Sequence, residues 1–200
     1  KATFAPFGRP TEFQRVGWRF VFSSPRTSVD YFACGPHDNY SDRKTGCFPA
    51  RYAASSRDFG FAGDVTQDAG SREDARYVKL ADPGLAFTST GPRRFAFQVS
   101  PHSATELLGC PHPELLPKPK KTELGLYARV RGLGSANCGP APLARDVIAA
   151  GEVCTLEFAL STYAADEEVV GDGLETAAWQ AKIDAAAARG GGRVSVPAGR

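Results

Sequence analysis

The strongest constraint on the fold is an alternation of apolar and polar residues that recurs in four separate runs. A period of two places every second side chain on the same face of a β-strand, so each run predicts a strand with one buried face. The apolar positions are Val16, Trp18, Phe20 and Phe22; Phe95, Phe97 and Val99; Leu124, Leu126, Ala128 and Val130; and Cys154, Leu156, Phe158 and Leu160. Turns rich in Gly and Pro separate the runs, and together these features predict a mainly β fold, an antiparallel sandwich.

The composition changes near residue 160. All 13 Phe and 14 of the 15 Pro lie before that point, whereas the last 40 residues contain ten Ala and no Phe. From Thr176, a candidate N-cap, the apolar period becomes helical until the glycines at 190–192, and a strand-like run follows at 193–197. We therefore predict three parts: a sandwich over 1–160, an acidic and Gly-rich linker over 161–173, and a C-terminal α-helix plus short strand over 174–200.

The charge balance and the cysteine spacing restrict the classes of function that we expect for this chain. Lys and Arg total 24 against 22 Asp and Glu, and the net charge of +2 favours neither nucleic-acid nor polybasic membrane binding. The five widely spaced cysteines include no C-x-x-C pair, which favours free thiols in a reducing compartment and predicts no metal site. The chain starts at Lys1 without a Met, so we expect a piece of a longer protein. We expect a cytoplasmic location, with secretion left open by the missing N-terminus.

A polar cluster follows the predicted turn at Gly35-Pro36. Its members lie within seven positions and are His37, Asn39, Tyr40, Asp42 and Arg43. Planar amide, carboxylate and guanidinium groups of this kind can bind a polyhydroxylated ligand. They can equally form a self-contained polar network that fixes a long connection, which we expect to extend over 34–76. We interpret the cluster as a structural motif.

Residues 35–43 closely resemble the G-P-H/Q-E-N-Y-P-D-R motif in the C-terminal β-sandwich of family 2 β-galactosidases. Four further segments resemble family motifs in the same order: 67–72 (Q/S-E-N-G-x-R), 95–100 (F-x-F-S), 110–115 (H-x-H-x-L) and 132–140 (G-x-G-G-D-D-S-W-x-P). The resemblance implies that the sandwich is part of a galactose-mutarotase-like supersandwich.

The resemblance also implies that this chain supplies no catalytic residue. In the family the two catalytic carboxylates, and the main magnesium and sodium ligands, belong to a separate (β/α)₈ barrel. The local carboxylates Glu73, Asp74, Glu106, Glu114 and Glu123 match no catalytic motif. We expect them on solvated surface or in structural ion pairs. The implied partners are the barrel domain of the parent hydrolase and its galactoside substrate, in a parent that could be a homo-oligomer.

The loop 132–140 is the implied contact with substrate. In the family, this loop presents a Trp whose face stacks against the sugar. Here Cys138 stands at that position, preceded by Asn137. A thiol lacks the broad apolar face of an indole, so sugar stacking by Cys138 is not expected. Asn137 and Cys138 are still the candidate substrate-binding residues, and the alternative is a purely structural turn.

The tail 174–200 resembles the N-terminal cap of pectin-lyase-like β-helix proteins, including polygalacturonases, in its helix and its G-G-G-x-V-x-V-P-x-G run. Two hypotheses follow. The chain is the non-catalytic C-terminal sandwich of a β-galactosidase-type glycoside hydrolase, where it shapes the active-site pocket and the assembly. Alternatively, it is a structural or carbohydrate-binding module fused to a polygalacturonase-like β-helix enzyme.

Overall fold

The computed structural model describes residues 1–9, 12–60, 63–135, 138–162 and 188. The chain divides into two compact units, Lys1–Ala164 and Ala165–Arg200. Of the second unit the structure describes Ala188 alone. The helix and strand predicted over 174–200 otherwise lie outside the described residues, as does the linker beyond Thr162. The resemblance to β-helix proteins, which depends on that segment, therefore stays a prediction.

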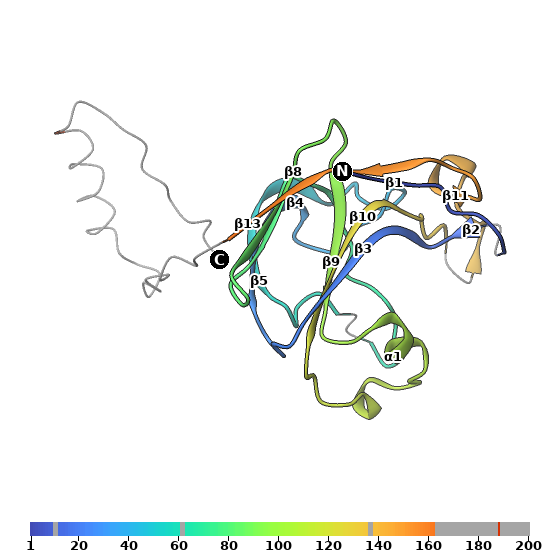
Figure 1. Cartoon of the computed structure of the whole chain (residues 1–200). Helices are drawn as coiled ribbons and strands as arrows, with labels where there is room; N and C mark the ends of the chain where they lie inside the picture. Colours follow the sequence, from blue (N-terminus) through green and yellow to red (C-terminus); the bar gives the residue numbers. More distant parts are fainter. Residues whose placement is uncertain (10–11, 61–62, 136–137, 163–187, 189–200) are drawn as a thin grey trace. The chain divides into compact units, whose positions relative to one another are not determined.

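The first unit consists of antiparallel strands in two main sheets (Figure 1). The five-stranded sheet has the order β13-β8-β7-β4-β5, with β4 (Ser28–Gly35), β5 (Phe48–Ser55), β7 (Tyr77–Leu80), β8 (Leu85–Ser89) and β13 (Phe158–Thr162). The four-stranded sheet has the order β3-β10-β9-β6, with β3 (Arg15–Phe22), β6 (Arg72–Ala75), β9 (Phe95–Ser100) and β10 (Thr122–Val130).

Two short strand pairs and a few helical turns complete this unit. The pairs are β1 (Ala2–Phe4) with β12 (Cys154–Leu156), and β2 (Glu12–Phe13) with β11 (Ile148–Ala149). The α-helix α1 (Ala104–Leu108) follows β9, and 3-10 turns occupy Pro113–Leu115 and Ala144–Asp146. The architecture confirms the predicted mainly β, antiparallel fold.

One hydrophobic core lies between the two main sheets. Its members that are at most 1% exposed include Tyr31, Val78 and Phe87 from the five-stranded sheet and Phe97, Leu124 and Leu126 from the four-stranded sheet. These positions alternate along their strands, because successive side chains of a strand point to opposite faces. The other face of the four-stranded sheet therefore carries the intervening residues of β3, β9 and β10.

Three of the four alternating runs form single strands as predicted, namely β3, β9 and β10. The fourth prediction is wrong in one respect, because a break at Glu157 divides that run between two sheets. Its first half, β12, pairs with β1, whereas its second half, β13, pairs with β8. The change of sheet explains why Leu156 is buried while Leu160 is 53% exposed. β13 also runs to Thr162, two residues past the predicted boundary at 160.

The expected long connection over 34–76 is also wrong, because this stretch contains the whole of β5 and of β6. β5 pairs with β4 along its whole length, from Ser28–Ser55 to Gly35–Phe48. It is the last strand of its sheet, and none of its residues is fully buried. Its inward positions Ala50, Tyr52 and Ala54 do alternate with more exposed residues, but two of the three are small alanines, so the period of two is weak in the sequence.

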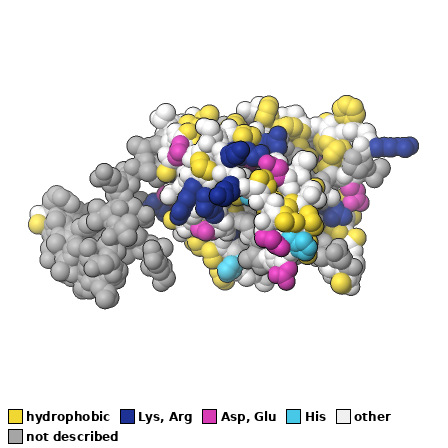
Figure 2. All heavy atoms as spheres, turned by 90° about the horizontal axis from the view of Figure 1, so that it is seen from below, with side chains coloured by type: hydrophobic (Ala, Val, Ile, Leu, Met, Phe, Trp, Pro, Cys, Tyr) yellow, Lys and Arg dark blue, Asp and Glu magenta, His cyan; other side chains and the backbone are white. Residues whose placement is uncertain are grey.

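The five cysteines are free thiols, as predicted. Cys34 and Cys154 are buried, and burial raises the pKa of the Cys34 thiol to about 11 and that of Cys154 above its ordinary value. Both thiols are therefore protonated and poor nucleophiles near neutral pH. Among the described residues, no helix has the length and apolar character needed to cross a membrane. Basic and acidic side chains are interspersed on the face shown in Figure 2.

Candidate functional site

The loop that leaves β4 is held from within by Asn39, which is fully buried. Its side-chain nitrogen donates to the carbonyl oxygens of Cys34 and His37, each at 2.9 Å. Its side-chain oxygen accepts from the backbone N–H of Glu73 at 2.8 Å, which ties the loop to β6. Asn39 therefore uses its hydrogen-bonding groups on the protein itself, while His37 lies exposed at the surface.

The next turn of the loop contains Asp42. Tyr40 and Arg43 exchange two backbone hydrogen bonds, of 3.1 and 2.9 Å, which close a tight turn around Ser41 and Asp42. The Tyr40 ring is buried against Tyr127 and Val130 of β10. Arg43 is exposed, pairs with Asp38 at 3.2 Å and lies 5.9 Å from the centre of the Tyr40 ring. The turn is thus anchored to the sheet on one side and presents Asp42 on the other.

Asp42 binds the loop that carries Cys138. Its carboxylate accepts hydrogen bonds from the backbone N–H groups of Leu133, at 3.1 Å, and Gly134, at 2.7 Å. Gly132 leaves room for this approach, because a Cβ there would lie 2.5 Å from the nearer carboxylate oxygen. We call this contact the Asp42 clamp. It joins two segments that the sequence analysis selected separately as a structural motif and as a substrate loop.

The clamped loop closes on itself beyond Gly134. Gly134 has a φ of +61°, a conformation that favours glycine, and the Ser135 N–H donates to the carbonyl of Pro140 at 3.0 Å. Cys138 donates its N–H to the Ser135 carbonyl at 3.4 Å, and its side chain is exposed. Asn137 lies outside the described residues. The structure therefore displays Cys138 at the surface of a loop whose base is fixed by Asp42.

Glu73 departs from the expectation for local carboxylates. Asp74 pairs with Lys44 at 2.7 Å, and Glu106 and Glu123 both pair with Lys121 at 2.9 Å, as predicted for structural ion pairs. Glu73 is instead largely buried, and its Oε1 atom has no hydrogen-bond partner among the described residues. Burial raises its pKa to about 7.

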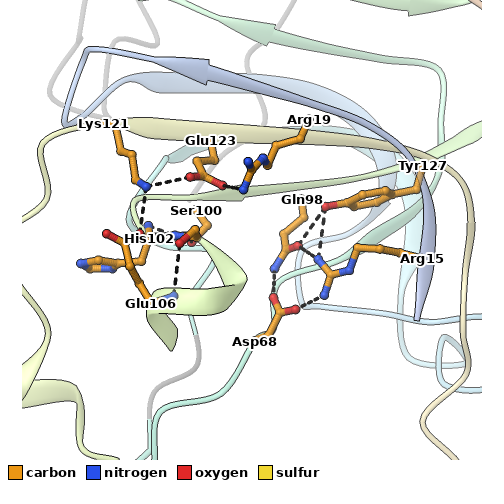
Figure 3. Close-up of polar contacts among 11 residues, drawn as sticks. Arg15, Arg19, Asp68, Gln98, Ser100, His102, Glu106, Lys121, Glu123 and Tyr127 are labelled. Carbon is orange, nitrogen blue, oxygen red and sulfur yellow. Dashed lines mark hydrogen bonds and ion pairs between the residues drawn. The ribbon is translucent and has the colours of Figure 1, made fainter. Parts of the chain in front are cut away.

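A second polar arrangement lies on the outer face of the four-stranded sheet (Figure 3). Arg15 of β3 donates to the side chains of Gln98 and Asp68 and, at 3.2 Å, to the Tyr127 hydroxyl. The Gln98 amide in turn donates to Asp68 at 2.6 Å. Asp68 belongs to the motif at 67–72, but its partners are 30 and 53 residues away in the sequence. We call Arg15, Asp68, Gln98 and Tyr127 the Arg15 network.

An ion-pair chain lies beside the Arg15 network on the same face. Glu123 of β10 pairs with Arg19 at 3.5 Å and with Lys121, which also pairs with Glu106 of α1. Ser103 caps α1 and donates its backbone N–H to Glu106 at 2.7 Å. That hydrogen bond, together with Lys121, lowers the pKa of Glu106 to about 2. We call Arg19, Lys121, Glu123 and Glu106 the Glu123 chain.

The sequence analysis missed both of these groups. Gly125 in the middle of a strand pattern was the available signal, because an isolated glycine in a strand often marks a close approach. A Cβ on Gly125 would collide with the phenol of Tyr127, so the glycine lets that ring lie along the sheet. Among the described residues, no group of three or more His, Cys, Asp and Glu is placed to hold a metal ion.

The antiparallel β fold is consistent with what comparison with known proteins shows. Residues 1–160 match the protein family described as beta galactosidase small chain, and the chain belongs to that family.

Its relatives are whole β-galactosidases. The enzyme of Arthrobacter sp. (strain B7) is 29% identical over 134 residues, which cover 64% of this chain and 13% of the relative. The β-galactosidase of Priestia megaterium is 26% identical over 133 residues, which cover 66% of this chain and 13% of the relative. The β-galactosidase of Halalkalibacterium halodurans is 29% identical over 127 residues, which cover 62% of this chain and 12% of the relative. The chain therefore matches only about an eighth of the length of these relatives.

Proposed function

We propose that this chain belongs to the non-catalytic sandwich of a β-galactosidase, and that its loop 132–140 borders the galactoside site of the parent enzyme. The observation that carries the proposal is the Asp42 clamp, which fixes the base of the loop while Cys138 stays exposed. A loop with a rigid base and an exposed tip can form part of the wall of a binding site, where it contacts another domain or a ligand.

In this proposal, other parts of the parent enzyme carry out catalysis and bind any metal ions. A retaining glycosidase uses two carboxylates about 5–5.5 Å apart, one of them free to attack the sugar. Glu106 and Glu123 are engaged in ion pairs, and Glu73 is largely buried. We therefore assign the acid, the nucleophile and any magnesium or sodium site to the barrel domain. The five free thiols favour a reducing compartment for the parent.

The proposal is tested by restoring an aromatic face at Cys138. In the complete parent enzyme, Cys138→Trp should tighten binding of a β-galactoside by about 0.5–1.5 kcal/mol, because an indole can stack on the sugar ring. Cys110→Trp is the matched control, since Cys110 is another free and partly exposed cysteine on a different loop. Ligand titration and thermal melting are measured on both variants. Unchanged affinity of the Cys138 variant together with a lower melting temperature would show a structural turn and refute the proposal.

A further inference from the structure

A hollow of about 230 Å³ separates the Arg15 network from the Glu123 chain. Gly125 lies at its floor, because its strand neighbours across the sheet are Arg19 on β3 and Gln98 on β9. All three residues point to the outer face, since Leu124 and Leu126 occupy the core. Gly125 has no side chain, and the phenol of Tyr127 covers part of its position, because a Cβ there would collide with the Tyr127 hydroxyl oxygen. Figure 3 shows the Arg15 network and the Glu123 chain side by side.

The wall formed by the Arg15 network is rigid. The Arg15 guanidinium lies 5.3 Å from the centre of the Tyr127 ring and is held in the sheet plane by Gln98 and Asp68. Gln98 is buried, and the Asp68 side chain is only 18% exposed. Side chains fixed in this way present hydrogen-bonding groups to a ligand without a large loss of conformational entropy on binding.

The opposite wall is more open. Arg19 of β3 pairs with Glu123 of β10 through a side chain that is 63% exposed, while the Glu123 side chain is 8% exposed. His102 and Ala104 close the end of the hollow near α1. Arg19 therefore retains guanidinium donors that face solvent, and both Glu123 oxygens are engaged with basic partners.

The charges of the two walls select the class of ligand. Arg15 is balanced by Asp68, and Arg19 with Lys121 is balanced by Glu123 with Glu106. A small anion or cation would have to displace an existing ion pair and leave a partly buried charge unpaired, which is unfavourable. A neutral ligand with many hydroxyls can accept from the guanidinium groups and donate to carboxylate lone pairs without breaking those pairs.

We propose that this hollow binds a single neutral hexose ring, either free or at the end of an oligosaccharide. Its volume lies below the range of roughly 300–1,000 Å³ that is typical of drug-sized ligands, which fits one sugar ring and not an extended chain. The site uses none of the residues of the Asp42 clamp or the loop 132–140. It can therefore exist whether or not that loop meets the galactoside of the parent enzyme.

The test is titration of the 200-residue chain with galactose and glucose, followed by two-dimensional NMR of the backbone amides. Saturable shifts are expected at the strand residues around Gly125. Ala104→Phe should fill the end of the hollow without touching either polar group and weaken binding about tenfold or more. Thr105→Phe is the matched control, because Thr105 is the adjacent exposed residue of α1 and does not line the hollow. Arg19→Ala is a second variant, chosen because its exposed side chain should be removable without unfolding the chain.

Three results would overturn the proposal. The first is the absence of saturable binding of either hexose up to about 100 mM, which is weaker than any specific site. The second is equal affinity of the wild type, Ala104→Phe and Arg19→Ala. The third is stronger binding of galacturonate or inorganic phosphate than of galactose, which would make the hollow an anion site. Loss of galactose binding in Ala104→Phe but not in Thr105→Phe supports it, whatever the outcome for Cys138→Trp in the parent.

Discussion

Glu73 is the residue whose environment most clearly opposes its charge. It directly follows the buried Arg72, its Oε1 atom lacks a partner among the described residues, and burial raises its pKa from 4.5 to about 7. The unfolded chain releases this proton near pH 4.5, whereas the folded chain holds it until about pH 7. The folded state therefore binds more protons between these values, and the contribution of Glu73 to stability falls as the pH rises through that window.

Replacing Glu73 by Gln should remove this pH-dependent loss. We expect Glu73→Gln to be more stable than the wild type at pH 8, by on the order of 1–3 kcal/mol, because a neutral amide is not penalised by burial in the way an anion is. The difference should shrink towards pH 4.5. Urea unfolding at a series of pH values measures it, with Glu114→Gln at an exposed position as the control. A constant difference across that range would contradict the assignment of a raised pKa to Glu73.

At the scale of the elements, the sandwich depends on aromatic contacts that cross between the sheets. Phe97 of β9 is fully buried, with its ring centre 5.2 Å from that of Tyr31 on β4 and 5.8 Å from that of Phe59. Phe97→Ala should reduce the free energy of unfolding by about 3–5 kcal/mol, because it leaves a cavity where the two sheets meet.

Phe48→Ala is the matched control for this substitution. Phe48 begins β5 and is 68% exposed, so its loss should change stability by less than about 1 kcal/mol. Thermal melts of the 200-residue chain compare the two variants. Similar losses for both would mean that the core does not lie between β4 and β9 as described.

The elements also show what the sequence could predict. β3, β9 and β10 were predictable because each carries its large apolar side chains on alternate positions, and small or polar residues between them, although β9 and most of β10 are buried on both faces. β5 was not, because its alternating inward positions Ala50, Tyr52 and Ala54 include two small alanines, which give only a weak period. The break at Glu157 was hidden for a different reason. β12 and β13 keep one continuous alternation although they belong to different sheets.

The candidate site, too, was only partly predictable from the sequence. The motif around Asn39 was predictable as a polar network, because its hydrogen bonds to Cys34 and His37 are local. The Asp42 clamp was not, since its partners Leu133 and Gly134 are 91 and 92 residues away. The Arg15 network likewise joins side chains from distant segments. Contacts of this kind follow from strand order, which the alternation of single strands does not specify.

At the scale of the whole molecule, the chain corresponds to about an eighth of the β-galactosidases it matches. We propose that this part is non-catalytic and affects the reaction by holding groups at the edge of the active site. In our account the loop 132–140 does so, and the Asp42 clamp sets its position. The clamp joins the two segments through two hydrogen bonds to one carboxylate, so a single substitution can release it.

The most direct test of this account is steady-state kinetics of the complete parent enzyme with Asp42→Ala. We expect the KM for a β-galactoside to rise about fivefold, equivalent to about 1 kcal/mol, with kcat changed less, because the loop loses its position while the catalytic groups do not. Asp38→Ala is the control, since Asp38 of the same turn forms an ion pair with the exposed Arg43. A KM for Asp42→Ala that equals those of the wild type and Asp38→Ala would contradict the central claim.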